Sequence, residues 1–220
     1  MVIIIMYTFS RYFSLFLVYA FLGWIIEVAL TIVKSKKAVN RGFLMGPIVP
    51  IWGVGALLIT FILKSSDGSF NLVVSSAFIG SFLEYIVNYF MEKIFKARWW
   101  DYSHLPFNVN GRIWLGSSLA FGIGGLFLIN YFNPFFMGFI NLIDRDWLCI
   151  ICTCLFAIFV VDFIVSCNII KNLKLTAYSI RKDYTEEVSK KVKLVLEEKS
   201  RSFRRLLKAF PDVRFHFKKK

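Results

Sequence analysis

Residues Ala97–Leu115 read ARWWDYSHLPFNVNGRIWL and separate two strongly apolar runs of the chain. Two adjacent Trp residues, a Tyr and a Phe lie here among Arg, Asp, His and Asn side chains. A simple connector consists mostly of Gly, Ser and charged residues, so this composition indicates a segment at an interface. Its aromatic rings are of the kind that settle at the head-group level of a membrane, and Asn110-Gly111 predicts a turn. We interpret Ala97–Leu115 as a rim or lid over a polar site.

The rest of the chain contains apolar segments of membrane-spanning length. The 220 residues are 57% hydrophobic, with a mean hydropathy of +0.62, and a helix needs about 20 mainly apolar residues to cross a bilayer. We expect residues 1–9 to lie along the surface or to extend the first helix. The sequence therefore predicts an all-α, polytopic helical membrane protein with five transmembrane helices, at about residues 12–33, 46–63, 71–95, 113–132 and 147–170.

Basic residues are unevenly distributed along the chain. The net charge is +13, and 16 of the 27 Lys and Arg residues lie within 171–220. Most of the others lie in the loops after the first and third apolar segments. Because cytoplasmic loops are enriched in Lys and Arg, we expect a multi-pass protein of the cell (plasma) membrane with its N-terminus outside and its C-terminus in the cytoplasm. Residues 1–170 then form the transmembrane domain, and residues 171–220 form a basic cytoplasmic tail.

The tail has the pattern of an amphipathic helix. Apolar residues recur at a spacing near 3.6 between positions 188 and 210, with Lys and Arg between them, and Pro211 ends the pattern. Such a helix can lie on membrane lipid, bind a partner protein or pair with a second copy of the chain in a homo-oligomer. The sequence leaves these alternatives open. Nucleic acid is a less favoured partner, because a basic cytoplasmic tail is common in membrane proteins.

Ionisable side chains inside the apolar segments are the first candidates for a functional role. A charged group within a span is unfavourable and usually faces a protein interior or a wet cavity. Four carboxylates lie in the predicted spans, namely Glu27, Glu84, Glu92 and Asp162. Glu84, Asn88 and Glu92 are four residues apart in the third span, so they lie on one face of a helix.

Glycine and proline punctuate the second and fourth spans. Gly116, Ala120 and Gly124 lie four residues apart and predict a ridge on which a neighbouring helix packs closely. Residues 40–47 read NRGFLMGP, and Pro50 and Gly53 follow. Such a run predicts a broken or re-entrant backbone before the second helix, which is stable at membrane depth only where it is buried in protein or faces water.

The basic loops supply counter-charges for the carboxylates. We expect Arg41, Arg98 and Arg112 to reach toward the acidic side chains from the cytoplasmic side. Three interpretations remain open, which are ion pairs that fix the helix register, a site that binds or passes a small polar or anionic ligand, and catalysis by paired carboxylates. The candidate ligand-binding residues are Glu27, Asn40, Arg41, Glu84, Asn88, Glu92, Arg98, Asp101, Asn108, Arg112 and Asp162.

Neither a catalytic residue nor a metal or cofactor site is specified by a motif. Cys149 and Cys152 have the spacing of half a metal site, but no second pair or nearby His completes it. We therefore interpret the four cysteines as small apolar residues of a membrane helix. His104, beside the acidic residue of the rim, is more typical of an interfacial polar residue than of a general base. We assign no catalytic residue and expect no cofactor.

Several motifs, taken together and in order, resemble one family. They are GWIIE at 23–27, NRGFLMGP at 40–47, PIWG at 50–53, EY at 84–85, RWWDYS at 98–103, PFN at 106–108 and GR at 111–112. Over residues 12–132 the chain resembles the ABC-transporter type IV (CmpB-like) membrane family. Trp114 departs from the family pattern, in which a Cys is common after Gly-Arg-Ile. The resemblance implies a small polytopic permease. The chain has no Walker-type sequence, so an ATP-driven role requires a separate ATPase subunit.

The leading hypothesis is a permease-like integral membrane protein with a polar vestibule open to the cytoplasm. An alternative is an intramembrane enzyme that acts on a lipid or polar head group at the inner leaflet, although a non-enzymatic role is favoured. A further alternative is a structural or regulatory membrane subunit whose basic tail recruits a partner.

Overall fold

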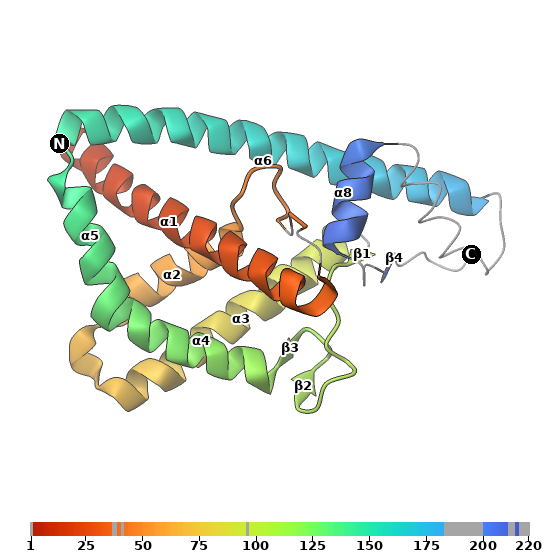
Figure 1. The fold of residues 1–220 in the computed structure, drawn as a ribbon, viewed down its shortest axis with the longest axis horizontal. Helices are drawn as coiled ribbons and strands as arrows, with labels where there is room; N and C mark the ends of the chain where they lie inside the picture. Colours follow the sequence, from red (N-terminus) through yellow and green to blue (C-terminus); the bar gives the residue numbers. More distant parts are fainter. Residues whose placement is uncertain are drawn as a thin grey trace.

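The computed structural model describes residues 2–36, 39–40, 42–95, 97–182, 200–210 and 214–215, and most of these are helical (Figure 1). The helices are α1 (Val2–Ser35), α2 (Pro50–Ile62), η1 (Ser65–Asp67), α3 (Ser69–Phe95), α4 (Leu115–Phe127), η2 (Leu128–Phe132), α5 (Asn133–Leu142), α6 (Arg145–Lys182) and α8 (Arg201–Ala209). The strands are β1 (Ala97–Arg98), β2 (Asn108–Val109), β3 (Ile113–Trp114) and β4 (Arg214–Phe215). β1 pairs with β4 and β2 with β3, both antiparallel.

Within the part of the chain that the structure describes, four helical stretches are long and apolar enough to cross a membrane. They are Val2–Val33, Ser69–Phe95, Leu115–Leu142 and Arg145–Leu173, whereas α2 is apolar but has only 13 residues. The prediction of an all-α polytopic membrane protein is therefore confirmed. Because α1 begins at Val2, the N-terminal residues extend the first helix instead of forming a separate surface segment.

Two helices continue beyond their predicted ends. The fourth span passes through η2, a π-helical segment, and α5 then carries the helix from the expected end at Phe132 to Leu142. Pro134 lies at the start of α5, and a proline removes a backbone donor and crowds the preceding turn. The wider π turn lies immediately before it, where it can absorb that mismatch. α6 continues from the expected end at Ile170 to Lys182.

An apolar core forms where α1 meets α2, α5 and α6 (Figure 1). Its buried residues include Phe13, Leu15, Phe16, Tyr19, Ala56, Ile59, Leu128, Ile140, Leu148 and Cys152. The outer faces of the spans are apolar as well, since only 11–22% of the residues in their most apolar windows are buried. An exposed apolar surface of this extent is typical of helices that lipid tails surround.

The buried side of α3 is largely polar or small. Its buried residues are Leu72, Ser76, Gly80, Ser81, Glu84 and Asn88. Glycines of α4 let the two helices approach closely along this side. A Cβ at Gly122 would lie 2.7 Å from the backbone oxygen of Val73, and a Cβ at Gly125 would lie 2.0 Å from Ser76 Oγ. The part of this side around Ser76 is therefore enclosed by close packing against α4.

The small residues that were predicted to form a ridge on α4 do not lie on the face that contacts α3. Ala120 is exposed, and a Cβ at Gly124 would meet nothing within 4 Å. The contacting face carries Gly122 and Gly125 instead, three residues apart. Sequence spacing predicts that small residues share a face, but this helix contains more small residues than its contact with α3 uses.

This contact predicts different effects for two neighbouring glycines. Gly122→Ala is expected to destabilise the protein by about 1–3 kcal/mol, because its Cβ meets the backbone oxygen of Val73, which cannot rotate away. Gly124→Ala is the matched control on the same helix, and we expect it to be neutral or slightly stabilising, because alanine is the better helix former. Thermal unfolding of the purified protein in detergent compares the two, and equal melting temperatures would contradict the packing.

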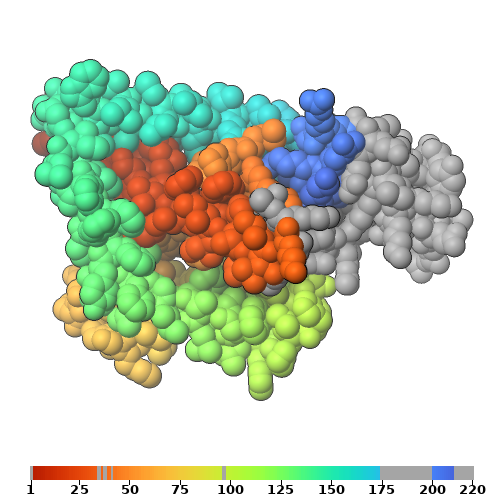
Figure 2. All heavy atoms as spheres, viewed as in Figure 1, coloured from red at the N-terminus to blue at the C-terminus, as the bar shows by residue number. Residues whose placement is uncertain are grey.

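Segments far apart in sequence meet at one end of the bundle (Figure 1). β1 and β4 pair there, and α8 lies across α6, with Leu206 and Leu207 buried in a cluster with Trp99, Ile170 and Leu173. Figure 2 shows α8 beside α6 and the segment that precedes α2. The loop after α3, which was predicted to be a rim, lies at this end.

Candidate functional site

The loop after α3 folds back on itself as a short hairpin. β2 and β3 pair Asn108 with Trp114, and the turn residues Asn110 and Gly111 have φ values of 54° and 64°. Positive φ suits Gly and is tolerated by Asn, so the predicted Asn110-Gly111 turn is confirmed. A Cβ at Gly111 would also lie 2.3 Å from Ser103 Oγ. The turn therefore depends on glycine for its backbone conformation and for its lack of a side chain.

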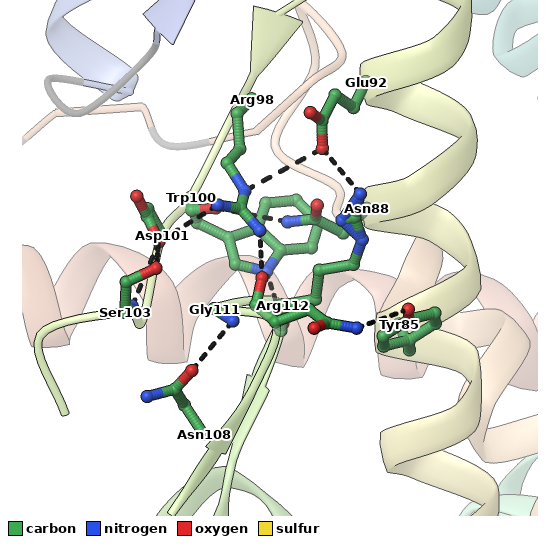
Figure 3. A network of polar contacts seen from close by, with 11 residues as sticks. Tyr85, Asn88, Glu92, Arg98, Trp100, Asp101, Ser103, Asn108, Gly111 and Arg112 are labelled. Carbon is green, nitrogen blue, oxygen red and sulfur yellow. Dashed lines mark hydrogen bonds and ion pairs between the residues drawn. The ribbon is translucent and has the colours of Figure 1, made fainter. Parts of the chain in front are cut away.

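Two arginines of this loop meet Glu92 near the end of α3 (Figure 3). Arg112 Nη2 lies 2.9 Å and Arg98 Nε lies 3.8 Å from Glu92 Oε2. Arg98 also lies 3.4 Å from Asp101 Oδ1 and donates to the backbone oxygen of Asn110. Among the described residues, this network pairs two cations with two carboxylates. Its side chains are mostly buried, so salt screens these pairs less than it screens pairs at an exposed surface.

Aromatic rings and backbone hydrogen bonds hold Arg112 in place. Its guanidinium carbon lies 5.5 Å from the ring centroids of both Tyr85 and Tyr89, and a desolvated cation–π contact contributes about 1–2 kcal/mol. The backbone oxygen of Arg112 accepts a hydrogen bond from Trp100 Nε1 at 3.1 Å. Asn88 in turn donates to the backbone oxygen of Trp100 at 3.2 Å. The stripe on α3 thereby fixes the loop above it (Figure 3).

Asn108 and Asp101 act mainly within the loop. Asn108 Oδ1 accepts from the backbone N–H of Gly111 at 2.9 Å, and its amide donates to the backbone oxygen of Leu105 at 2.7 Å. Asp101 Oδ1 accepts from the backbone N–H of Ser103 at 3.0 Å and from its hydroxyl at 2.5 Å. These contacts shape the hairpin that carries the arginines.

Glu84 lies on α3 about two turns before Glu92, and hydroxyl groups are its hydrogen-bond partners. Its side chain is buried, with 7% of the residue exposed. The hydroxyl of Tyr102 donates to Oε1 and the hydroxyl of Ser117 donates to Oε2, each at 3.1 Å. Glu27 of α1 is near enough for its charge to act on Glu84. Among the described residues, hydroxyl groups take the place of the arginine partners that the sequence suggested for Glu84.

Asn40 and Asp162 form a second group, around the segment that precedes α2. Asp162 Oδ1 accepts from the backbone N–H of Met45 at 2.9 Å, and Oδ2 accepts from that of Gly46 at 2.8 Å. Asn40 Oδ1 accepts from Trp24 Nε1 at 2.8 Å, and its amide donates to the backbone oxygen of Met45 at 3.0 Å. The segment is not helical, so these side chains satisfy peptide groups that a helix would pair internally.

Arg205 of α8 binds the same segment. Its Nη1 donates to the backbone oxygens of Gly42 at 3.2 Å and Leu44 at 2.8 Å, and its Nη2 donates to that of Phe43 at 3.4 Å. Burial lowers the pKa of the Arg205 guanidinium below its ordinary value, and the nearby charge of Asp162 opposes this shift. Five consecutive residues before α2 are therefore held by a guanidinium and a carboxylate.

The candidate residues thus fall into two hydrogen-bonded groups. Glu27 lies on α1, close to the first group, and Arg41 lies outside the described residues. Tyr102, Ser117 and Arg205 belong to these groups although the sequence did not single them out. The first group contains Glu84, Asn88, Glu92, Arg98, Asp101, Asn108 and Arg112, and the second contains Asn40 and Asp162.

The hairpin turn offers a test of the rim. Gly111→Ala is expected to loosen the loop, because the new Cβ would be strained at positive φ and would collide with Ser103 Oγ and Asp101 Oδ1. Gly68→Ala is the matched control, since Gly68 has a φ of 80° but open space around it. Limited proteolysis of the loop should therefore be faster for Gly111→Ala than for Gly68→Ala. Equal rates would contradict the collision.

These elements define a polytopic α-helical membrane protein that encloses polar residues within its bundle. The model of the family described as "Putative ABC-transporter type IV" matches residues 14–167. The chain belongs to this family, which confirms the resemblance seen in its motifs and associates the protein with membrane transport. Neither a curated protein nor a solved structure matches the chain.

Proposed function

We propose that the protein is a permease-like component of the cell membrane whose polar site, centred on Glu84, binds or passes a small polar ligand. The observation that carries this proposal is the buried carboxylate of Glu84 in a helix long enough to span a membrane. Its hydrogen-bond partners are hydroxyl groups. Ionisable residues within spans are rare and commonly mark pathways for substrates or ions.

The proposed topology has five crossings, with the N-terminus outside and the C-terminus in the cytoplasm. α1 and α3 both end at the side of the bundle where the loop after α3 and α8 lie (Figure 1). The chain between them must therefore return to the opposite side, and α2 together with the non-helical segment before it supplies that crossing. Short basic loops favour the cytoplasm, so this end of the bundle is assigned to it.

The chemistry around Glu84 favours a ligand that carries hydrogen-bond donors. The hydroxyls of Tyr102 and Ser117 bind the carboxylate by single bonds of 3.1 Å, and an N–H or O–H group of a ligand can replace them. Arg98 and Arg112 already pair with carboxylates. An anionic ligand would have to displace those pairs, so a neutral or amine-bearing ligand suits this site better than an anion.

The test compares cells that lack the gene with the same cells carrying it on a plasmid. We expect untargeted profiling to show a several-fold difference in one or a few small polar metabolites, restored by the plasmid, with an unchanged lipid composition. Altered head groups with unchanged soluble metabolites would overturn the proposal in favour of an enzyme acting on lipid. A separate ATPase that co-purifies with the protein would identify the source of energy for transport.

A further inference from the structure

The apolar side of α8 is already occupied by protein. Leu206, Leu207 and Ala209 are buried, and the first two pack in a cluster with Trp99 and Leu173. An amphipathic helix that binds a membrane normally inserts its apolar face between the lipids. α8 cannot bind a membrane in this way, because the rest of the bundle covers its apolar face.

The opposite side of α8 is basic and exposed. Arg201, Arg204 and Lys208 are all exposed, and their spacing of three and four residues places them on one face of the helix. The sequence of α8, RSFRRLLKA, contains no acidic residue. Arg205 lies beside this face, four residues after Arg201, but its guanidinium contacts the backbone of the segment before α2. The basic face is held outward because Leu206 and Leu207, on the other side of α8, are buried against the bundle.

The position of α8 places this basic face at the surface of the bilayer. α8 runs across α6 in Figure 1 and contacts it at Ile170 and Leu173, where the apolar span of α6 ends. Trp99, an aromatic residue of the kind found at head-group level, packs in the same cluster. A helix at this level has lipid head groups as its neighbours.

We infer that the exposed face of α8 that carries Arg201 and Lys208 is a docking surface for anionic phospholipid head groups. Basic residues near an anionic membrane surface are attracted to it within about one Debye length. This row of exposed cations along a helix matches a surface that presents many negative charges. It does not form the enclosed, convergent pocket that would select one small free anion. This surface is separate from the site around Glu84.

Native mass spectrometry of the full-length protein in a neutral detergent tests the inference. The protein is equilibrated with equal amounts of phosphatidylglycerol and phosphatidylcholine, and the lipids that it retains are counted. We expect the wild type to prefer phosphatidylglycerol and to lose this preference in 0.5 M NaCl. Combining Arg201→Gln with Lys208→Gln should reduce the preference by about fivefold for each charge removed.

The matched control removes the same charge elsewhere. Lys64→Gln with Arg145→Gln changes two exposed basic residues away from α8, and it should keep most of the preference. Equal retention of both lipids by the wild type, or equal loss in the two double variants, would overturn the inference. Displacement of phosphatidylglycerol by inorganic phosphate would also overturn it, because it would show a site for a free anion. Unchanged melting temperatures establish that both double variants are folded.

Discussion

If the proposed site is correct, replacing Glu84 by glutamine is expected to weaken binding of the proposed ligand about ten- to hundredfold. The amide has nearly the size of the carboxylate, so the packing of α3 against α4 should persist. It cannot accept two charge-assisted hydrogen bonds, however, and hydrogen bonds to charged groups contribute about 1.5–3 kcal/mol. The measurement is the level of the responding metabolite in cells that express the variant in place of the wild type.

A second carboxylate provides the control for this experiment. Asp67 lies in η1, where it accepts from the backbone N–H of Lys64 at 2.7 Å, and Asp67→Asn makes the same chemical change outside the proposed site. We expect Asp67→Asn to restore the metabolite fully and Glu84→Gln to fail, at equal abundance in the membrane. Full restoration by Glu84→Gln would show that the function does not need the Glu84 carboxylate and that its role is structural.

Replacing Asp162 by alanine is expected to destabilise the segment before α2 by about 1–3 kcal/mol. The carboxylate accepts from the backbone N–H groups of Met45 and Gly46 and from the hydroxyl of Ser166. The substitution leaves a partly buried donor at Gly46 and an exposed one at Met45 without their acceptor. A buried unpaired donor costs about 1–3 kcal/mol, and the segment is not helical, so no helical acceptor replaces the carboxylate. Asp162→Asn should lie between the wild type and Asp162→Ala, because its amide oxygen still accepts while its amide nitrogen cannot.

Asp146 is the matched control for this series. It lies on the same helix, its side chain is 78% exposed, and it pairs only with Arg145 among the described residues. Exposed pairs contribute about 0–1 kcal/mol, so Asp146→Ala should leave the melting temperature nearly unchanged. Hydrogen exchange at Met45 and Gly46 should rise in Asp162→Ala and stay as in the wild type in Asp146→Ala. Unchanged exchange in Asp162→Ala would contradict the proposed role of this carboxylate.

Features that follow from composition and spacing could be predicted from the sequence. The apolar segments, the stripe of Glu84, Asn88 and Glu92, and the turn at Asn110-Gly111 are local patterns with a direct physical cause. The irregular backbone before α2 follows in the same way from its Gly and Pro content. Each of these features depends on residues close together in the chain.

The sequence predicted that Arg98 and Arg112 reach toward carboxylates of the spans, and both pair with Glu92. The partners of Glu84 and the role of Arg205 could not be predicted. Tyr102 and Ser117 carry no charge, so nothing in the sequence distinguishes them from hydroxyls that face solvent or a backbone oxygen. Arg205 is one of 16 basic residues after position 170, and only its contact with the segment before α2 sets it apart. The face of α4 that meets α3 was also beyond sequence analysis, because lipid and protein both accept small apolar residues.

Cysteine accessibility at position 84 tests most directly whether this site is open to the cytoplasm. Glu84→Cys would be placed in a chain whose four native cysteines are replaced by serine, and treated with a membrane-impermeant thiol reagent in sealed vesicles of both orientations. Phe82→Cys, two residues away on an exposed part of α3, is the lipid-facing control. The proposed site predicts labelling of position 84 from the cytoplasmic side and none of position 82. Labelling of position 84 from the outside, or from neither side, would contradict it.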